Sequence, residues 1–141
     1  MTPTPELKVA QNLTSADYLA QRVKEAYLSI GSENVANLES LYTPDIHFED
    51  PSHAVQGKRS LMKYLHKQFS NLSKCSFKFH SSIASETDIF LTWTMFLNHP
   101  KLRGGDTIRV EGSSYLRTRN GKIYYHRDYF DMGAMLYEHL P

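Results

Sequence analysis

Two aspartates and one histidine are the residues of this sequence whose types and positions best fit acid–base chemistry. Asp50 follows a short apolar-polar alternation in IHFEDP at 46–51, and Asp128 lies in GKIYYHRDYFD at 121–131. Side chains two residues apart in a regular strand lie on the same face, so His126 and Asp128 become near neighbours if the second run is a strand. If Asp50 enters from the opposite wall, two carboxylates and an imidazole surround one space.

Such a group can divide the roles of a general acid and a general base. Desolvation raises the pKa of a carboxylate and a nearby cation lowers it, so unequal surroundings keep one group protonated and leave another ready to accept a proton. Catalysis of this kind contributes about 100- to 10,000-fold to a rate. We therefore take Asp50, Asp128 and His126 as the candidate catalytic residues.

Each of these residues also has a purely structural interpretation. Asp50 precedes Pro51 and can end a strand by accepting local backbone hydrogen bonds in the following turn. Asp128 can form an ion pair with Arg127 or another base, although strict alternation directs these two neighbouring side chains apart. His126 can be a core histidine with satisfied hydrogen bonds, or can point outward where a bulge shifts the register.

Large apolar side chains recur at strand spacing around these polar residues. Such side chains can line a ligand cavity, and they can equally fill a core. The candidates for contact with an apolar ligand are Phe48, Trp93, Met95, Leu97, Ile108 and Val110. Tyr115, Tyr125 and Tyr129 are expected on the outer face of the same strands, where exposed aromatic rings would need cover. A homodimer formed through this face would provide it.

Composition and charge set the class of protein. A chain of 141 residues with 40% apolar and 12% aromatic residues suits one domain with a genuine core and is not typical of a disordered chain. Its 16 basic and 15 acidic residues, without a block of like charge, disfavour a nucleic-acid partner.

Other compartments and chemistries are disfavoured by what the sequence lacks. The single Cys75 cannot form an internal disulfide, which favours a reducing, cytoplasmic setting. No apolar run approaches the roughly 18 residues of a membrane-spanning helix, so we expect no membrane partner. Neither His-Glu-x-x-His nor Cys-x-x-Cys spacing occurs, and Gly112-Ser113-Ser114 lacks the spacing of a nucleophile elbow. We therefore expect no metal and no cofactor.

The elements that must position the candidate residues follow from periodicity. Apolar residues at three- and four-residue steps predict a helix from Thr14 or Ser15 to Gly31, a second at about 35–42, and a third after Gly57 to about residue 72. A short strand is expected at 46–51. Four long strands are predicted at about 74–84, 87–98, 106–119 and 122–131, followed by a tail with a helical turn or two at 132–141. Asn120-Gly121 is a strong hairpin signal because both residues tolerate positive φ. This order indicates an α+β fold with a curved sheet around helices.

The order of elements, together with YTPDIHFEDP at 42–51, Gly57-Lys58 and GKIYYHRDYFD at 121–131, resembles the nuclear transport factor 2-like superfamily. That superfamily includes SnoaL-like polyketide cyclases, ketosteroid isomerases and limonene epoxide hydrolases. The resemblance implies a cystatin-like, cone-shaped α+β barrel, in which three N-terminal helices pack on a strongly curved, mostly antiparallel sheet around a deep apolar pocket. It also implies dimers formed through the sheet. We expect a flexible N-terminal arm at 1–14 and a single SnoaL-like domain at 15–141.

The resemblance further implies roles for individual residues. Asp50 stands where ketosteroid isomerases place their carboxylate base, and Asp128 stands where limonene epoxide hydrolases place the aspartate that activates water. Tyr27 lies one residue from the position of the tyrosine that donates to the oxyanion in the isomerases, and is a candidate ligand contact. Trp93 and Met95 stand where the hydrolases have an arginine and an acidic partner, which disfavours epoxide hydrolysis of that type.

Three functions are open at this point. The leading hypothesis is a cofactor-independent enzyme of isomerase or cyclase type, which transfers protons in an apolar, carbonyl-containing small molecule. The second is a non-catalytic ligand-binding or accessory module of the same fold, whose polar groups only orient a bound molecule. The third is an interaction adaptor that uses the aromatic outer face of the sheet. Convergence of Asp50, His126 and Asp128 on a closed, dry pocket would favour the enzyme.

Overall fold

The computed structural model describes residues 14–133 of the chain. The arm expected at 1–14 and the tail expected at 132–141 therefore lie almost wholly outside the described residues. The division of the chain into an arm and one domain stays a prediction.

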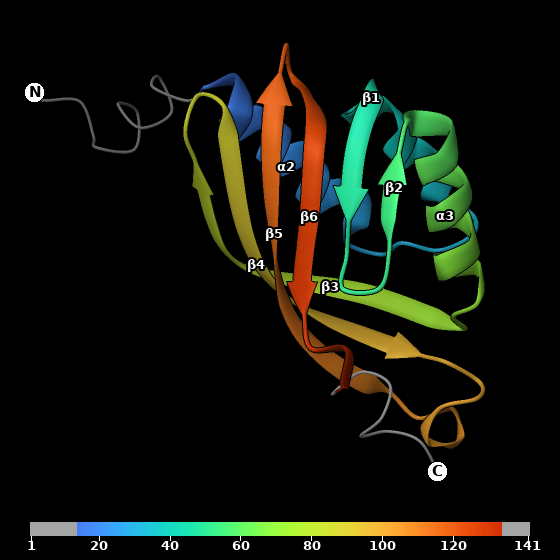
Figure 1. Ribbon diagram of the computed structural model, residues 1–141. Coiled ribbons are helices and arrows are strands. Elements are labelled where there is room, and N and C mark those ends of the chain that lie inside the picture. The colour runs from blue at the N-terminus through green and yellow to red at the C-terminus, as the bar shows by residue number, and fades with distance from the viewer. Residues whose placement is uncertain (1–13, 134–141) are drawn as a thin grey trace, which may run out of the picture.

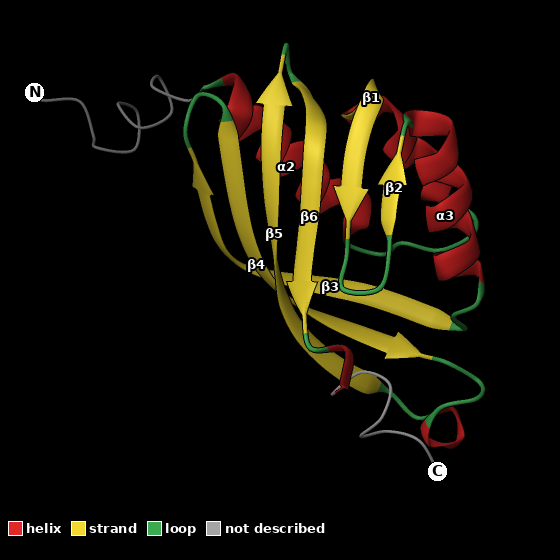
Figure 2. Ribbon diagram, in the orientation of Figure 1, coloured by secondary structure: helices red, strands yellow, loops and turns green. Residues whose placement is uncertain are grey.

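Six strands form one mixed sheet (Figures 1 and 2): β1 (Tyr42–Glu49), β2 (Ala54–Gln56), β3 (Lys74–Ala84), β4 (Asp88–Asn98), β5 (Ile108–Arg119) and β6 (Lys122–Phe130). Their order is β2-β1-β6-β5-β4-β3. β3 to β6 form an antiparallel meander whose ends lie within two residues of the predicted ones. β1 pairs with β6 in parallel. Asn120 and Gly121, with φ of 53° and 75°, make the predicted hairpin turn.

Three longer helices accompany the sheet in the described part of the chain: α2 (Ser15–Tyr27), the 3-10 helix η1 (Val35–Leu41) and α3 (Lys58–Ser70). A short 3-10 helix, η2 (Arg103–Gly105), lies between β4 and β5. Of the two predicted starts, Thr14 is the residue that caps α2, because its hydroxyl accepts a hydrogen bond from the backbone N–H of Asp17 at 3.1 Å. The helix ends at Tyr27, four residues before the predicted Gly31. α2 contacts β3 and β4, whereas α3 contacts β1 and β2. Figure 1 shows the long strands bending around α2, with α3 beside the β1 and β2 end of the sheet. No helix among residues 14–133 is both long and apolar enough to cross a membrane.

The structure corrects the predicted start of the first strand. β1 begins at Tyr42, four residues before the predicted strand, and β2 has no counterpart among the predicted strands. The register of β1 against β6 shifts between Tyr42 and His47. This irregularity buries Tyr42 and Thr43 together and removes the alternation that identifies a strand in the sequence.

A second irregularity changes the face of β6 on which one side chain lies. Alternation places Tyr124 on the face of His126, but the register shifts by one residue between the pairs Arg117–Tyr125 and Thr118–Ile123. Tyr124 instead packs against guanidinium groups, 5.8 Å from that of Arg117 and 4.9 Å from that of Arg119. Ile123 takes the inward position and is fully buried. Beyond this bulge the strand alternates regularly and brings His126 and Asp128 to one face.

Candidate functional site

A cavity of about 490 Å³ lies between α3 and the inner face of the sheet, a size typical of small-molecule sites. Both candidate carboxylates are on its wall, Asp50 just after β1 and Asp128 on β6. Five of the candidate ligand contacts also line it, namely Tyr27, Phe48, Trp93, Met95 and Leu97. Most of the remaining wall is apolar and includes Leu65, Phe69, Leu72, Phe77, Leu102 and Phe130. The cavity is therefore suited to an apolar ligand that meets acidic groups at one point.

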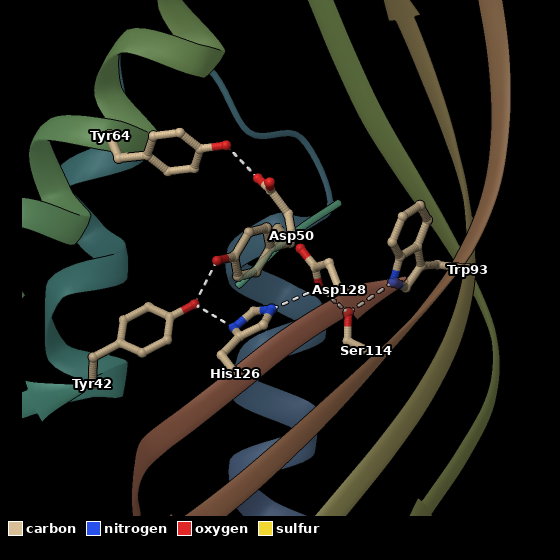
Figure 3. A network of polar contacts seen from close by, with 8 residues as sticks. Tyr42, Asp50, Tyr64, Trp93, Ser114, His126 and Asp128 are labelled. Atoms are coloured by element: carbon tan, nitrogen blue, oxygen red, sulfur yellow. Dashed lines mark hydrogen bonds and ion pairs between the residues drawn. The ribbon is translucent and has the colours of Figure 1, made fainter. Parts of the chain in front are cut away.

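Asp128 is the end point of two chains of hydrogen bonds (Figure 3). Its Oδ1 accepts a hydrogen bond from the Ser114 hydroxyl at 2.6 Å and lies 2.7 Å from Nε2 of His126. Both contacts end on Oδ1, so Oδ2 takes part in neither. The Asp128 side chain is 22% exposed, whereas that of His126 is 4% exposed. Within residues 14–133, both of these contacts hold one oxygen of Asp128, and its carboxylate borders the cavity.

The direction of the first chain follows from Trp93, whose indole N–H can only donate. It donates to Oγ of Ser114 at 2.9 Å, so the hydroxyl proton of Ser114 is directed to Asp128. Gly112 makes this arrangement possible, because a Cβ at that position would lie 2.3 Å from Cη2 of Trp93. Asp128 is therefore the acceptor at the end of this chain.

The second chain reaches His126 through two buried tyrosines. The hydroxyl oxygens of Tyr27 and Tyr42 are 2.5 Å apart, and the Tyr42 hydroxyl lies 3.0 Å from Nδ1 of His126. Burial raises the pKa of both hydroxyls well above the ordinary value, so both stay protonated. With a neutral imidazole, Tyr27 donates to Tyr42, Tyr42 donates to Nδ1, and the Nε2–H group donates to Asp128.

His126 therefore acts from behind the carboxylate. It does not line the large cavity but borders a separate space of about 20 Å³ beneath it, together with Asp128 and Trp93. Its ring lies 4.7 Å from the ring of Phe48, centroid to centroid. In this position His126 can orient Asp128 and stabilise its charge, while Asp128 alone meets the ligand.

Asp50 fits both of the interpretations that its sequence context leaves open. Its Oδ1 accepts three hydrogen bonds in the turn after β1, from the backbone N–H groups of Ser52 and His53 and from the Ser52 hydroxyl. Its Oδ2 accepts a hydrogen bond from the hydroxyl of Tyr64 on α3 (Figure 3). Burial, and then this hydrogen bond, raise the pKa of Tyr64 above its ordinary value, so the hydroxyl stays protonated. Unlike Asp128, Asp50 uses both oxygens within the protein.

Two candidate ligand contacts lie elsewhere. Ile108 and Val110 are buried, at 0% and 3% exposure, and are not on the wall of the cavity. They pair with Leu97 and Met95 across β4 and β5 and share the inner face of the sheet with them. Alternation identifies that face correctly, but whether other side chains or an empty space cover it depends on packing that alternation does not encode.

Three polar residues of the site were not among the sequence candidates. Ser114 interrupts the inward apolar positions of β5, and a polar residue in such a row is a signal for a buried contact. Tyr64 lies on α3 beside the apolar stripe of Leu61 and Leu65, where its hydroxyl reaches Asp50. Tyr42 carries no comparable signal, since its strand is not recognisable from alternation.

The other acid–histidine pair of the sheet faces away from the cavity. Nε2 of His47 lies 2.7 Å from Oε1 of Glu49, and the imidazole stacks on Tyr125. Within residues 14–133, no three side chains of histidine, cysteine, aspartate or glutamate come together as they would around a metal ion.

Comparisons with known proteins agree with this architecture. The profile of the SnoaL-like domain family matches residues 23–126, and no curated protein matches the sequence significantly. Among solved structures, an LEH-like epoxide hydrolase of M. tuberculosis shares 20% identity at a TM-score of 0.68, covering 85% of this chain and 88% of its own.

Two further structures extend the comparison. An NTF2-like protein of unknown function from Burkholderia pseudomallei has a TM-score of 0.77 at 14% identity, over 89% of this chain and 97% of its own. A candidate SnoaL-like polyketide cyclase from Shewanella putrefaciens has a TM-score of 0.71 at 15% identity, over 88% and 95%. Likeness at these identities shows a shared fold, which hosts more than one activity.

Proposed function

The chain belongs to the SnoaL-like domain family, and from this premise we propose that it is a cofactor-independent enzyme of isomerase or cyclase type. Its substrate is an apolar small molecule with a carbonyl or similarly polarised group, and its reaction is proton transfer. The observation that carries the proposal is Asp128, whose Oδ1 is held by two hydrogen-bond partners while the rest of the carboxylate borders an apolar cavity.

Asp128 is the general base in this proposal. Its Oδ2 removes a proton from the carbon next to the carbonyl, and the electron pair of that C–H bond moves toward the carbonyl oxygen to form an enol or enolate. In an isomerisation, Asp128 then returns the proton to another carbon. In a cyclisation, the enolate carbon attacks a second carbonyl carbon of the substrate, the π bond of that carbonyl breaks, and Asp128 gives its proton to the resulting alkoxide. Ser114 and His126 are positioning residues, because both act through Oδ1.

The tyrosine hydroxyls are the groups suited to the developing oxyanion. Tyr27 and Tyr64 both line the cavity and stay protonated, since burial raises their pKa values. A neutral donor in a site of low polarity stabilises developing negative charge more strongly than it does in water. In the free protein the single hydroxyl proton of Tyr64 goes to Asp50 and that of Tyr27 goes to Tyr42. We propose that the developing oxyanion draws one of these protons away from its present acceptor, and that Asp50 holds the Tyr64 hydroxyl at the cavity wall until then.

Two broader features belong to the same proposal. The curved sheet and its helices are proposed to close into the cone-shaped barrel of the superfamily. The outer face is proposed to form a homodimer, since Ile83, Phe90 and Tyr115 follow one another across β3, β4 and β5, and Ile83 and Phe90 are 69% and 41% exposed. Apolar side chains gathered on one face favour such an interface.

Deuterium exchange tests the proton transfer without knowledge of the natural substrate. 1-Tetralone, an apolar ketone, is incubated with the protein in D2O, and deuterium at the carbon next to the carbonyl is measured by mass spectrometry. We expect exchange above the buffer rate, and a loss of about 100-fold or more in the protein-dependent rate on Asp128→Asn. Glu111→Gln is the control, because Glu111 is an exposed carboxylate that pairs with Arg109 outside the cavity.

The alternative function is a ligand-binding module without turnover. It is favoured by one observation, the use of both Asp50 oxygens inside the protein. Binding of 1-tetralone, followed by the emission of Trp93 on the cavity wall, together with exchange at the buffer rate would support the module and contradict the enzyme. Equal exchange by wild type and Asp128→Asn would contradict the role given to Asp128.

A further inference from the structure

The acidic groups among the described residues of the cavity wall lie at one end. Among the described residues on its wall, the two carboxylates are Asp50 and Asp128. Trp93 is at this end, because its indole is tied to Asp128 through Ser114. On the opposite wall, Tyr64 marks the same end, because its hydroxyl bonds to Asp50 (Figure 3).

The other end of the cavity lies where α3 ends and β4 ends. The backbone N–H of Ser73, just after α3, donates to the carbonyl of Asn98 at 2.9 Å, so the two segments are adjacent. Four polar residues of the cavity wall come from them: Gln68 and Asn71 from the end of α3, and His99 and Lys101 from the loop after β4.

The two ends of the cavity are separated by several residues along both of its walls. His99 follows Trp93 by six residues, most of them in β4, which corresponds to roughly 20 Å in extended chain. Asn71 follows Tyr64 by seven residues, roughly 10 Å along a helix. The wall between them is apolar and includes Phe69, Met95 and Leu97. A ligand that fills the cavity therefore meets carboxylates at one end, apolar side chains along its length, and different polar groups at the other end.

His99 and Lys101 supply hydrogen-bond donors at this second end. The backbone N–H of Lys101 donates to Nδ1 of His99 at 3.0 Å, so Nδ1 is the acceptor and the ring proton is on Nε2. The Lys101 ammonium adds a positive charge, and its long stem can lie on the apolar wall. The amide of Asn98 bonds to the Gly105 carbonyl at 2.9 Å, and Leu102 bonds back to the His99 carbonyl at 3.0 Å. The loop is thus held in place before a ligand arrives.

We propose that this end binds a carboxylate group of the ligand, through Lys101 and His99. One ammonium and one imidazole N–H match the single charge of a carboxylate better than the larger charge of a phosphate. The carboxylates of Asp50 and Asp128 repel an anion, so the ligand enters in one orientation only. The identity of the substrate rests in addition on the proposed function. If both hold, the substrate is an apolar carboxylic acid whose reacting carbonyl is remote from its carboxylate.

Binding of matched probes tests the carboxylate site directly. Decanoate and methyl decanoate share one apolar body and differ in the charge of the head group. Their binding is followed by the emission of Trp93, the single tryptophan, and by equilibrium dialysis. We expect decanoate to bind about tenfold more tightly than the ester, and this preference to fall to about twofold or less in Lys101→Met. Lys122→Met is the control, because Lys122 begins β6 and does not line the cavity.

The salt dependence of probe binding tests the charged contact, and the deuterium-exchange assay tests the enzyme activity separately. Higher ionic strength should weaken decanoate binding and leave ester binding unchanged, because only the charged contact is screened. Equal affinities for the two probes, a preference that survives Lys101→Met, or the absence of binding would each overturn the inference. Failure of Asp128 to promote deuterium exchange would leave the probe result untouched, so loss of the proposed enzyme activity and loss of the carboxylate site are distinguishable.

Discussion

Replacement of Gly112 by alanine places a methyl group where the indole of Trp93 lies. The added Cβ would meet Cη2 at 2.3 Å and both Cζ2 and Cζ3 at 2.7 Å, whereas carbon atoms prefer about 3.5 to 4.0 Å. The indole must retreat by roughly 1 Å, which breaks its hydrogen bond to Ser114. Overpacking costs about 1 to 3 kcal/mol and a lost hydrogen bond about 1 kcal/mol, so we expect the free energy of unfolding to fall by about 3 kcal/mol.

Thermal unfolding measures this loss. The entropy of unfolding is about 2.1 cal/mol/K per residue, or roughly 0.3 kcal/mol/K for this chain. A loss of about 3 kcal/mol therefore lowers Tm by about 10 °C, followed by circular dichroism and by the emission of Trp93. Gly31→Ala is the matched control, because Gly31 has nothing within 4 Å of the added Cβ and no positive φ. Its Tm should stay within a few degrees of wild type.

A double variant identifies the cause. In a Trp93→Phe background the ring is smaller, so Gly112→Ala should cost clearly less than it does in wild type, a coupling that appears only between residues in contact. If Gly112→Ala unfolds at the wild-type temperature with unchanged emission, the indole does not lie against the backbone of β5. The hydrogen bond from Trp93 to Ser114, with which the chain to Asp128 begins, would then be contradicted as well.

Three further predictions concern other parts of the molecule. The hydrogen bond to Glu49 raises the pKa of His47, and the same contact lowers that of Glu49. The stability from this contact is complete below the ordinary histidine value of 6.5, is lost as pH rises through the raised value, and requires Glu49 to be ionised. The Tm difference between wild type and His47→Gln should therefore be greatest in mildly acidic buffer and vanish in alkaline buffer; a difference independent of pH would refute this. Burial raises the pKa of the Cys75 thiol to about 12, so iodoacetamide near neutral pH should label it only as fast as the protein unfolds, and rapid labelling of the folded protein would show that the thiol is accessible. Phe90→Glu, on the exposed outer face, should convert the proposed dimer to a monomer in light scattering with Tm measured in parallel, whereas a wild-type monomer would exclude the dimer.

The meander and its turns are predictable because their signals are local. β-branched and aromatic runs separated by turn residues indicate β3 to β6 within two residues, and Asn120-Gly121 adopts the positive φ values that its residue types permit. The proximity of His126 and Asp128 follows from the two-residue period of a strand. It is the one part of the site that needs no knowledge of packing.

The rest of the site depends on contacts between distant segments. Tyr64 and Asp50 meet because α3 packs on β1, and periodicity reports only which face of a helix is apolar. The bulge at Tyr124 moves one side chain to the other face without a distinctive residue to mark it. Ile108 and Val110 are core residues rather than cavity residues for a similar reason, since a strand pattern does not tell a filled space from an empty one.

The parallel pairing of β1 with β6 has a consequence for how the molecule folds. Asp50 and Asp128 are 78 residues apart in the chain, and β1, which pairs locally with β2, gains its second partner only when β6 is in place. Contacts so distant in sequence form slowly, because the intervening chain must first be ordered. During synthesis the β1–β2 pair can therefore form early, but it cannot join the meander until nearly the whole described chain has emerged. We expect the meander to form first and the wall that carries Asp50 to join last, which leaves the edge of β6 open to wrong strand partners in the interval.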